Sequence, residues 1–383
     1  MLTGSNKNKL IKGDVVIMKF FNRVSALFLA IVITVSSLSQ VTLYASSFNN
    51  DNGHVLPMSQ IEFLLSSMAL ESEITGIDSN GVIELGSQLY AYRREYRLEN
   101  IDDISWYPVL VNDAVVAIIT LHGDPQEPIV SLKSDFAPQL NAFVHSNNAP
   151  FALLFEGENL YAVTYHAQEI LQTYHGVHAV NEFPFSRTVV EMQFSNIEAV
   201  YEITLPEYHF DAYFVTPFFD EPMARNGVFL NVPIVLQGSA GLCWAASVSS
   251  KGRFLTGQSA TLANSPSMIA INAGIGFNDG ATIFQTRDAL DRTFRIRTSV
   301  IGSSPSNMDV VNITQSGRPI ITGFWGGGDG HMVVIRGFSS SSQGFAVSYM
   351  DPNFGFASIV NPADRNLTIA VGSRIMTAVE HLR

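Results

Sequence analysis

The stretch "LQGSAGLCWAASVSSKGRFL", Leu236–Leu255, contains Cys243, the only cysteine of the 383-residue chain. Gly238 and Gly241 close a strand-like run, and the small residues after them predict a helix that begins at or near Cys243. At a helix N-terminus, unpaired N–H groups and the macrodipole favour a negative charge. Because the thiolate is the nucleophilic form of cysteine, this position indicates a reactive residue. A small buried hydrophobe is the alternative role for a lone cysteine.

A thiolate needs a base, and His331 is the candidate among nine histidines. It follows the glycine-rich segment "WGGGDG" and begins the apolar run "MVVI". We therefore expect His331 at the start of a strand, where the glycine loop lets it reach the mouth of a cleft. A strand-end histidine that only binds a backbone carbonyl is the alternative.

The residue that orients this base is predicted from strand pairing. The segments "HMVVIRGF" and "FAVSYMDP" flank the polar run "SSSSQG", which predicts an antiparallel hairpin. With the turn centred near Ser341, His331 faces Asp351, and opposed residues share a face of the sheet. Asn353 is the alternative orienting residue, and a one-residue bulge would complicate the choice. The Asp351-Pro352 pair can also simply end the strand.

Gln237 precedes Cys243 by six residues. Its side-chain amide can donate to a developing oxyanion, together with the backbone N–H of Cys243. A solvated loop glutamine is the alternative.

The order of elements predicts an α+β protein with two folded regions. Residues 46–222 begin with helical spacing at 58–73 and continue as short β-rich runs, one of them a hairpin with Asn112-Asp113 at its turn. Residues 223–383 contain helices first and strands later, which predicts a helical part packed on an antiparallel sheet. The proline-rich, charged segment 206–233 is the expected linker.

Residues 1–45 are typical of an export signal, with a basic leader, the apolar core Val24–Leu38 and a small residue, Ala45, at the cleavage point. The apolar core is shorter than the roughly 20 residues that a membrane span needs. We therefore expect a secreted, extracellular or surface-associated protein with no stable membrane span once the signal is removed. A retained membrane anchor is the alternative.

Composition excludes several classes of function. The net charge is −12, and the leader holds five of the 22 basic residues, so the exported part is strongly acidic and argues against nucleic-acid binding. A single cysteine excludes an internal disulfide. His166, His175 and His178 lie near Glu169 in the sequence but match no familiar metal-ligand spacing. We predict neither a metal nor an organic cofactor.

The segment "QGSAGLCWA" closely resembles the active-site segment of papain-like cysteine peptidases. "GHMVVIRGF" and "YMDPNFG" resemble the His and Asn/Asp segments of that family, in the same order, so that the resemblance covers residues 228–360. It is closer to compact bacterial branches such as staphopains than to papain, whose Ser-Trp after the Asn and whose disulfides are absent here. The resemblance implies a papain-like catalytic domain with Cys243 as nucleophile, His331 as base and then acid, Asp351 or Asn353 as orienting residue and Gln237 as oxyanion donor.

The same resemblance implies a secreted endopeptidase that hydrolyses proteins or peptides through a thioester acyl-enzyme. It also implies a zymogen, in which residues 46–222 inhibit the enzyme until a cut in the proline-rich segment. A stably attached accessory domain is the alternative for those residues. Two other functions stay open: a different Cys-His-Asp acyl-transfer enzyme, such as a transglutaminase-like protein or a cell-wall amidase, and a non-catalytic surface-binding protein. Gln237 and Trp244 favour the peptidase.

Overall fold

The computed structural model describes residues 56–70, 83–94, 98–147, 150–164, 168–174, 177–178, 213–215, 226–238, 240–341, 344–360 and 365–383. All of these residues fall within the unit Asn52–Arg383. The expected export signal at 1–45 and most of the expected linker at 206–233 lie outside the described residues. Within these ranges, no helix is long and apolar enough to cross a membrane.

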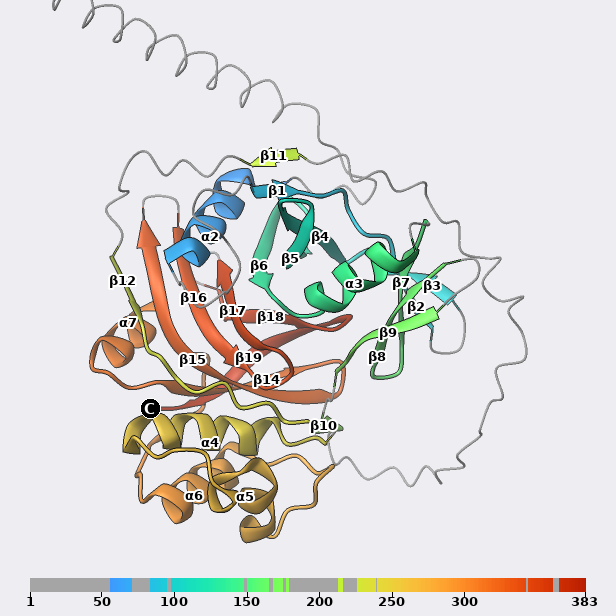
Figure 1. Ribbon diagram of the computed structural model, residues 1–383. Helices are drawn as coiled ribbons and strands as arrows, with labels where there is room; N and C mark the ends of the chain where they lie inside the picture. Colours follow the sequence, from blue (N-terminus) through green and yellow to red (C-terminus); the bar gives the residue numbers. More distant parts are fainter. Residues whose placement is uncertain are drawn as a thin grey trace, which may run out of the picture. The chain divides into compact units, whose positions relative to one another are not determined.

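Among the described residues, fourteen strands form one large sheet (Figure 1). Its main path runs β11-β1-β4-β5-β6-β17-β16-β15-β14-β19-β13, while β10 and β12 pair with β15, and β18 pairs with β19. The strands of this sheet are β1 Ile83–Leu85, β4 Ile104–Val111, β5 Ala114–Asp124, β6 Glu127–Lys133, β10 Val177–His178, β11 Tyr213–Val215, β12 Asn226–Phe229, β13 Val300–Ile301, β14 Ile320–Gly326, β15 Asp329–Ser341, β16 Gly344–Asp351, β17 Gly355–Val360, β18 Thr368–Val371 and β19 Arg374–Leu382.

The pairing of β6 with β17 joins the two predicted regions. Val130 lies opposite Val360, and Lys133 lies opposite Ala357, in an antiparallel register. The strands that precede residue 134 therefore continue the sheet that follows residue 300. Helices with antiparallel strand pairs agree with an α+β protein, but a separate preceding domain is not confirmed.

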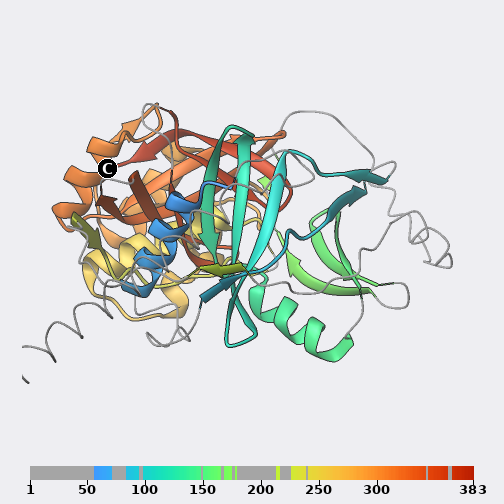
Figure 2. The ribbon, with the colours of Figure 1, turned by 90° about the horizontal axis from the view of Figure 1, so that it is seen from above.

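A second, five-stranded sheet lies in the N-terminal half, in the order β3-β2-β7-β8-β9. Its strands are β2 Ala91–Arg94, β3 Leu98–Asn100, β7 Ala152–Glu156, β8 Asn159–Val163 and β9 Gln168–Thr173. β2 and β7 are parallel, and the other pairs are antiparallel. Figure 2 shows helix α3, Ala137–Asn147, beside this sheet and the strands of the larger one.

The remaining helices are α2 Met58–Leu70, α4 Cys243–Thr256, α5 Pro266–Ala273, α6 Ile283–Phe294 and α7 Asn307–Gln315. Helices α4, α5 and α6 lie together on one side of the large sheet (Figure 1). Trp244 and Val248 of α4 and Leu290 of α6 pack there against Met332 and Met350 of the sheet. This apolar layer holds the helix that begins at Cys243 against the strands that carry His331 and Asp351.

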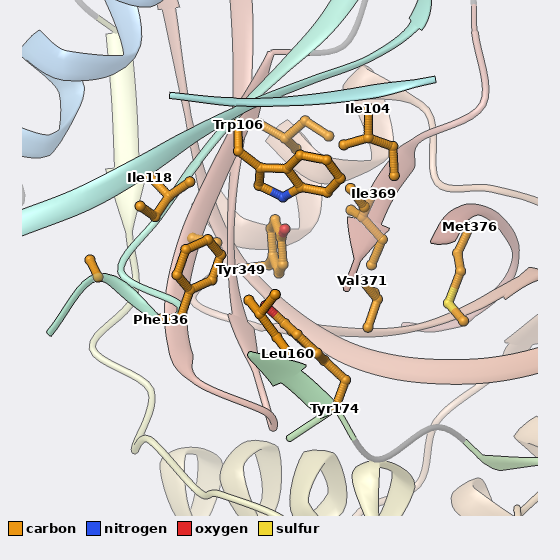
Figure 3. Packing of buried hydrophobic residues seen from close by; sticks show 14 of the residues in the cluster. Ile104, Trp106, Ile118, Phe136, Leu160, Tyr174, Tyr349, Ile369, Val371 and Met376 are labelled. Atoms are coloured by element: carbon orange, nitrogen blue, oxygen red, sulfur yellow. The ribbon is translucent and has the colours of Figure 1, made fainter. Parts of the chain in front are cut away.

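The opposite face of the sheet packs against the N-terminal half. Figure 3 shows Trp106 and Leu160 from that half close to Tyr349, Ile369 and Met376 from the C-terminal half. All five side chains are buried in one cluster. The two halves therefore share a hydrophobic core, and neither covers its apolar surface alone.

Most elements of the C-terminal half agree with the sequence prediction. The helix predicted from Cys243 is α4, and it ends before Gly257, which adopts the left-handed conformation. The Asn112-Asp113 hairpin is confirmed, since both residues have positive φ angles, 51° and 65°, at the turn between β4 and β5. Among the elements that were not predicted are strands β3, β6, β9, β12 and β17 and helix α5. The strand-like run expected before Gly238 is wrong, since residues 230–237 form no strand. The start of α5 carries a usable signal, because Ser265 caps the helix and Pro266 occupies its first turn.

Candidate active site

Cys243 is the first residue of helix α4 and is 2 % exposed. The residue before it, Leu242, offers no side-chain cap, so no side chain of that residue satisfies the N–H groups of the first turn. The positive end of the helix dipole and these N–H donors therefore lie at the residue that carries the thiol. The position predicted from the small residues around Cys243 is therefore correct.

Serine hydroxyls tie this helix to its surroundings. Ser247 Oγ donates to the carbonyl of Met332 at 3.2 Å, and Ser250 Oγ donates to the carbonyl of Pro233 at 2.7 Å. Met332 directly follows His331, so the first of these bonds fixes the helix against the strand that carries the expected base. Small side chains allow this close approach, because Ala245, Ala246 and Ser247 are all fully buried.

His331 lies near the start of β15, and its Nε2 lies 2.8 Å from Oδ1 of Asp351 at the end of β16. Both side chains are 1 % exposed. Cys243 lies close enough to the ring to add to the raised pKa of the imidazole. Within the described ranges, Nδ1 of His331 has no hydrogen-bond partner. The structure thus places Cys243 near the pair of His331 and Asp351, with Nε2 bound to Asp351 and Nδ1 left without a hydrogen bond.

The hairpin register differs from the prediction. The turn lies between Ser341 and Gly344, rather than around Ser341, and a bulge between Ile335 and Gly337 shifts the pairing by one residue. Continuing the register beyond Val334–Met350 places His331 opposite Asn353, not Asp351. Asp351 is the diagonal neighbour on the same face, and diagonal side chains remain within reach. The predicted contact is therefore made, although by a different register.

Without the bulge, the register nearer the turn would put His331 and Asp351 on opposite faces of the sheet, because Gly337 pairs with Ser348 there. Arg336 is the extra residue, and its buried guanidinium holds the bulge. Its Nε donates to Ser348 Oγ at 3.1 Å, and the guanidinium lies 3.9 Å from the centre of the Phe356 ring. Bulges near active sites commonly redirect a side chain in this way.

The charge state of His331 follows from its neighbours. Burial lowers the pKa of the imidazole, but the charge and hydrogen bond of Asp351, with the added interaction of Cys243, outweigh burial and raise this pKa to about 10. An imidazolium held by a carboxylate on one side can balance a thiolate on the other. The arrangement therefore suits nucleophilic attack by sulfur followed by proton donation from nitrogen.

Gln237 and Asn353 lie beside this group without touching the imidazole through any described hydrogen bond. The backbone N–H of Gln237 donates to the carbonyl of Pro352 at 2.9 Å, and its Nε2 donates to Oδ1 of Asn353 at 3.1 Å. The N–H of Asn353 donates to Oδ1 of Asp351 at 2.8 Å. Asp351 rather than Asn353 therefore contacts the ring, and Asn353 connects Gln237 to the carboxylate. The oxyanion role of Gln237 stays a prediction.

The segment before His331 is more ordered than the expected flexible loop. Gly327 and Gly328, with φ angles of 62° and 84°, make a tight turn between β14 and β15, and Gly330 already belongs to the strand. A Cβ on Gly330 would lie 3.3 Å from the ring of Trp325, which is 44 % exposed. This tryptophan beside the catalytic strand was not predicted, since no sequence pattern links it to His331.

Strand β10 from the N-terminal half pairs with β15 next to His331. Val177 and His178 of β10 pair with Gly330 and Asp329, directly before His331. Nearby, Gln172 donates to the carbonyl of Asn353 at 3.3 Å. Residues of the N-terminal half thus contact segments next to both His331 and Asp351, and Cys243, His331 and Asp351 are all at most 2 % exposed.

The part of the chain that the structure describes contains no group of three metal-ligating side chains. His166 and His175 lie outside the described residues.

Comparison with known proteins adds a family to this geometry. Residues 227–360 match the family described as papain-like cysteine protease AvrRpt2. This match supports a cysteine peptidase, a hydrolase, over that segment of the chain. The match spans β12 to β17, so Gln237, Cys243, His331 and Asp351 all lie within it. A staphopain-like branch is not confirmed, and no curated protein that was compared matches the chain.

Proposed function

We propose that the chain is an exported bacterial cysteine endopeptidase that is made in a latent form. The observation that carries this proposal is the arrangement of Cys243, His331 and Asp351, in which one imidazole hydrogen-bonds a buried carboxylate and is influenced electrostatically by the cysteine at the start of helix α4. These three groups are what thiol-based acyl transfer requires: a nucleophile, a proton carrier and a group that orients the carrier. The substrate is a protein or peptide.

In the proposed reaction, the thiolate of Cys243 attacks the carbonyl carbon of the scissile bond. The backbone N–H of Cys243 and the amide of Gln237 stabilise the oxyanion. His331, protonated and held by Asp351, gives its proton to the leaving amine, and a thioester remains on Cys243. Neutral His331 then takes a proton from water, whose oxygen attacks the thioester and releases the acid product and the thiolate.

Latency is supported by the burial of the site. Cys243 as a residue is 2 % exposed, so we expect that a peptide reaches it only when the chain around it moves. Strand β10 is the neighbour that we expect to move, because it pairs with Asp329 and Gly330 directly before His331 and precedes the proline-rich segment in the sequence. We propose that a cut in residues 206–225 frees β10 from its place beside His331.

Cys243→Ala tests the catalytic proposal. The variant should lose cleavage of unfolded casein while its far-UV circular dichroism stays unchanged, because the smaller side chain fills the same buried position. Iodoacetamide should label Cys243 rapidly in the active wild-type form. Equal casein cleavage by the variant would reject the assignment, and amine incorporation without peptide hydrolysis would favour a transglutaminase-like enzyme instead.

Val177→Pro tests the latency proposal, since proline removes a backbone N–H and disfavours the paired strand. Iodoacetamide should label Cys243 faster in this variant than in the intact wild-type chain. N-terminal sequencing over time should show that wild-type activity rises as the chain is cut. Full activity of a persistently uncut chain would contradict latency.

A further inference from the structure

We propose that Lys133, Asp135 and Tyr174, three residues of the N-terminal half, are positioning residues for Asp351: they anchor the turn after Asp351 and leave the charge of Asp351 to act on His331. This inference rests on the proposed function. It assigns residues 83–174 to the active enzyme itself, so that a cut in residues 206–225 separates the chain without removing this half from the site.

The three residues form a closed network inside the molecule. Lys133 Nζ lies 3.2 Å from Oδ2 of Asp135, and neither side chain is more than 1 % exposed. The hydroxyl of Tyr174 donates to the same carboxylate, at 2.7 and 2.8 Å from its two oxygens. A buried ion pair with added hydrogen bonds is costly to assemble, and it is retained where it fixes a particular arrangement.

The backbone at Asp135 is strained to make this network. Its φ angle is 27°, in the left-handed region that side-chain-bearing residues rarely occupy. Strain of this kind persists only where the surroundings enforce it, and it clusters at functional sites. Tyr174, which binds the Asp135 carboxylate, is closely packed, because a Cβ on Gly372 would lie 3.1 Å from its ring.

The network contacts the segment that follows Asp351. Lys133 Nζ lies 5.6 Å from the centre of the Phe354 ring, three residues after Asp351, and also donates to the carbonyl of Ala370 at 3.1 Å. Two residues before Tyr174, Gln172 donates to the carbonyl of Asn353. Side chains of the N-terminal half thus hold the turn that follows Asp351.

The charge of Lys133 must be neutralised if Asp351 is to act on His331. An unpaired Lys133 beside this turn would attract the Asp351 carboxylate and compete with the imidazolium of His331. Asp135 neutralises Lys133, and Tyr174 stabilises the Asp135 carboxylate. Burial raises the pKa of Asp135. The interactions of Asp135 with Lys133 and Tyr174 lower that pKa, and the charge of Asp351 raises it, so the two carboxylates interact electrostatically. Asp351 likewise adds to the raised pKa values of Tyr174 and Tyr349, while the ring of His331 itself meets Cys243 and Asp351.

Asp135→Asn tests the inference in the wild-type background after activation. Asparagine keeps the shape but leaves the charge of Lys133 uncompensated, so the alkaline limb of kcat/KM for casein peptides should move down by about half a pH unit to one unit. The double variant Lys133→Met/Asp135→Asn removes both charges and should return the limb towards its wild-type position. Tyr174→Phe should move it in the same direction as Asp135→Asn, by less.

Arg365→Met is the matched control, because Arg365 forms an exposed ion pair with Glu127 at the other end of β6. It should leave the limb unmoved. An unmoved limb in Asp135→Asn, or a double variant that fails to restore it, would overturn the proposal, as would full activity after the N-terminal half is separated by gel filtration. If the wild-type chain cleaves nothing, the proposed function fails. The pH dependence of Cys243 alkylation, which needs no turnover, then still tests the network.

Discussion

Asp351→Asn separates the two ways in which Asp351 acts on His331. The asparagine carbonyl can still accept a hydrogen bond from Nε2, as Oδ1 does at 2.8 Å in the wild-type protein, but the negative charge is gone. Burial, which lowers the pKa of His331, is then opposed only by the hydrogen bond and by Cys243. The proton should therefore leave the imidazole at a lower pH than in the wild-type protein.

The magnitude follows from the environment of the ring. Raising the pKa of His331 from 6.5 to about 10 corresponds to about 5 kcal/mol, at 1.36 kcal/mol for each pH unit. Because the imidazolium is the form that donates to the leaving amine, losing most of this stabilisation should move the alkaline limb of kcat/KM down by about two pH units or more. For a shift of two units, the variant should lose roughly tenfold in rate at about pH 9, and little at about pH 6.

The assay is the pH profile of kcat/KM for a fluorogenic casein peptide, measured from about pH 5 to about pH 10.5 on activated enzyme. Asp288→Asn is the matched control, because this carboxylate is exposed and pairs only with Arg287 among the contacts described. Asp351→Ala should lose more than Asp351→Asn at every pH, since the hydrogen bond is lost as well. An alkaline limb that stays in place in Asp351→Asn would refute the electrostatic role of Asp351.

Three further predictions concern stability. Gly252→Ala would place a Cβ 2.2 Å from the Phe294 ring and should lower the free energy of unfolding by about 1–3 kcal/mol in urea titrations, whereas Gly302→Ala meets no atom within 4 Å and should not. Trp106→Ala should cost about 3–5 kcal/mol and destabilise both halves in a single transition, since its cluster spans them; separate transitions would contradict a shared core. Burial and Arg318 lower the pKa of Lys251 to about 7, so between pH 7 and 10.5 the unfolded chain keeps a proton on this lysine that the folded protein has lost. Any stability advantage of Lys251→Met should therefore shrink as pH rises from 7 towards 10.5. A difference in stability that stays constant with pH would contradict the lowered pKa.

The local parts of the fold could be read from sequence. Small residues after Gly241 predicted α4, and the Asn-Asp pair predicted a hairpin, because capping and turn chemistry act over a few residues. Cys243 and His331 could be chosen as the candidate nucleophile and base for the same reason. Their meeting with Asp351 was also predicted, although the register behind that prediction was wrong.

Long-range pairing could not be read in this way. The partnership of β6 with β17 joins residues more than 220 positions apart, and no local pattern at Lys133 or Ala357 announces it. A proline-rich segment at 206–233 therefore looked like a domain boundary, although the sheet crosses it. The network of Lys133, Asp135 and Tyr174 was invisible for the same reason, since its members become neighbours only when that sheet forms.

The bulge at Arg336 decides whether His331 and Asp351 lie on the same face of the sheet, because each added or removed strand residue moves the side chains beyond it to the other face. Residues inserted at the tip between Ser341 and Gly344 only lengthen the connection, and His331 still finds Asp351. Deleting Arg336 alone would leave the tip intact, yet it would send the imidazole and the carboxylate to opposite sides of the sheet. In descendants of this chain, length changes should therefore be tolerated at the tip and come in compensating pairs along the strands.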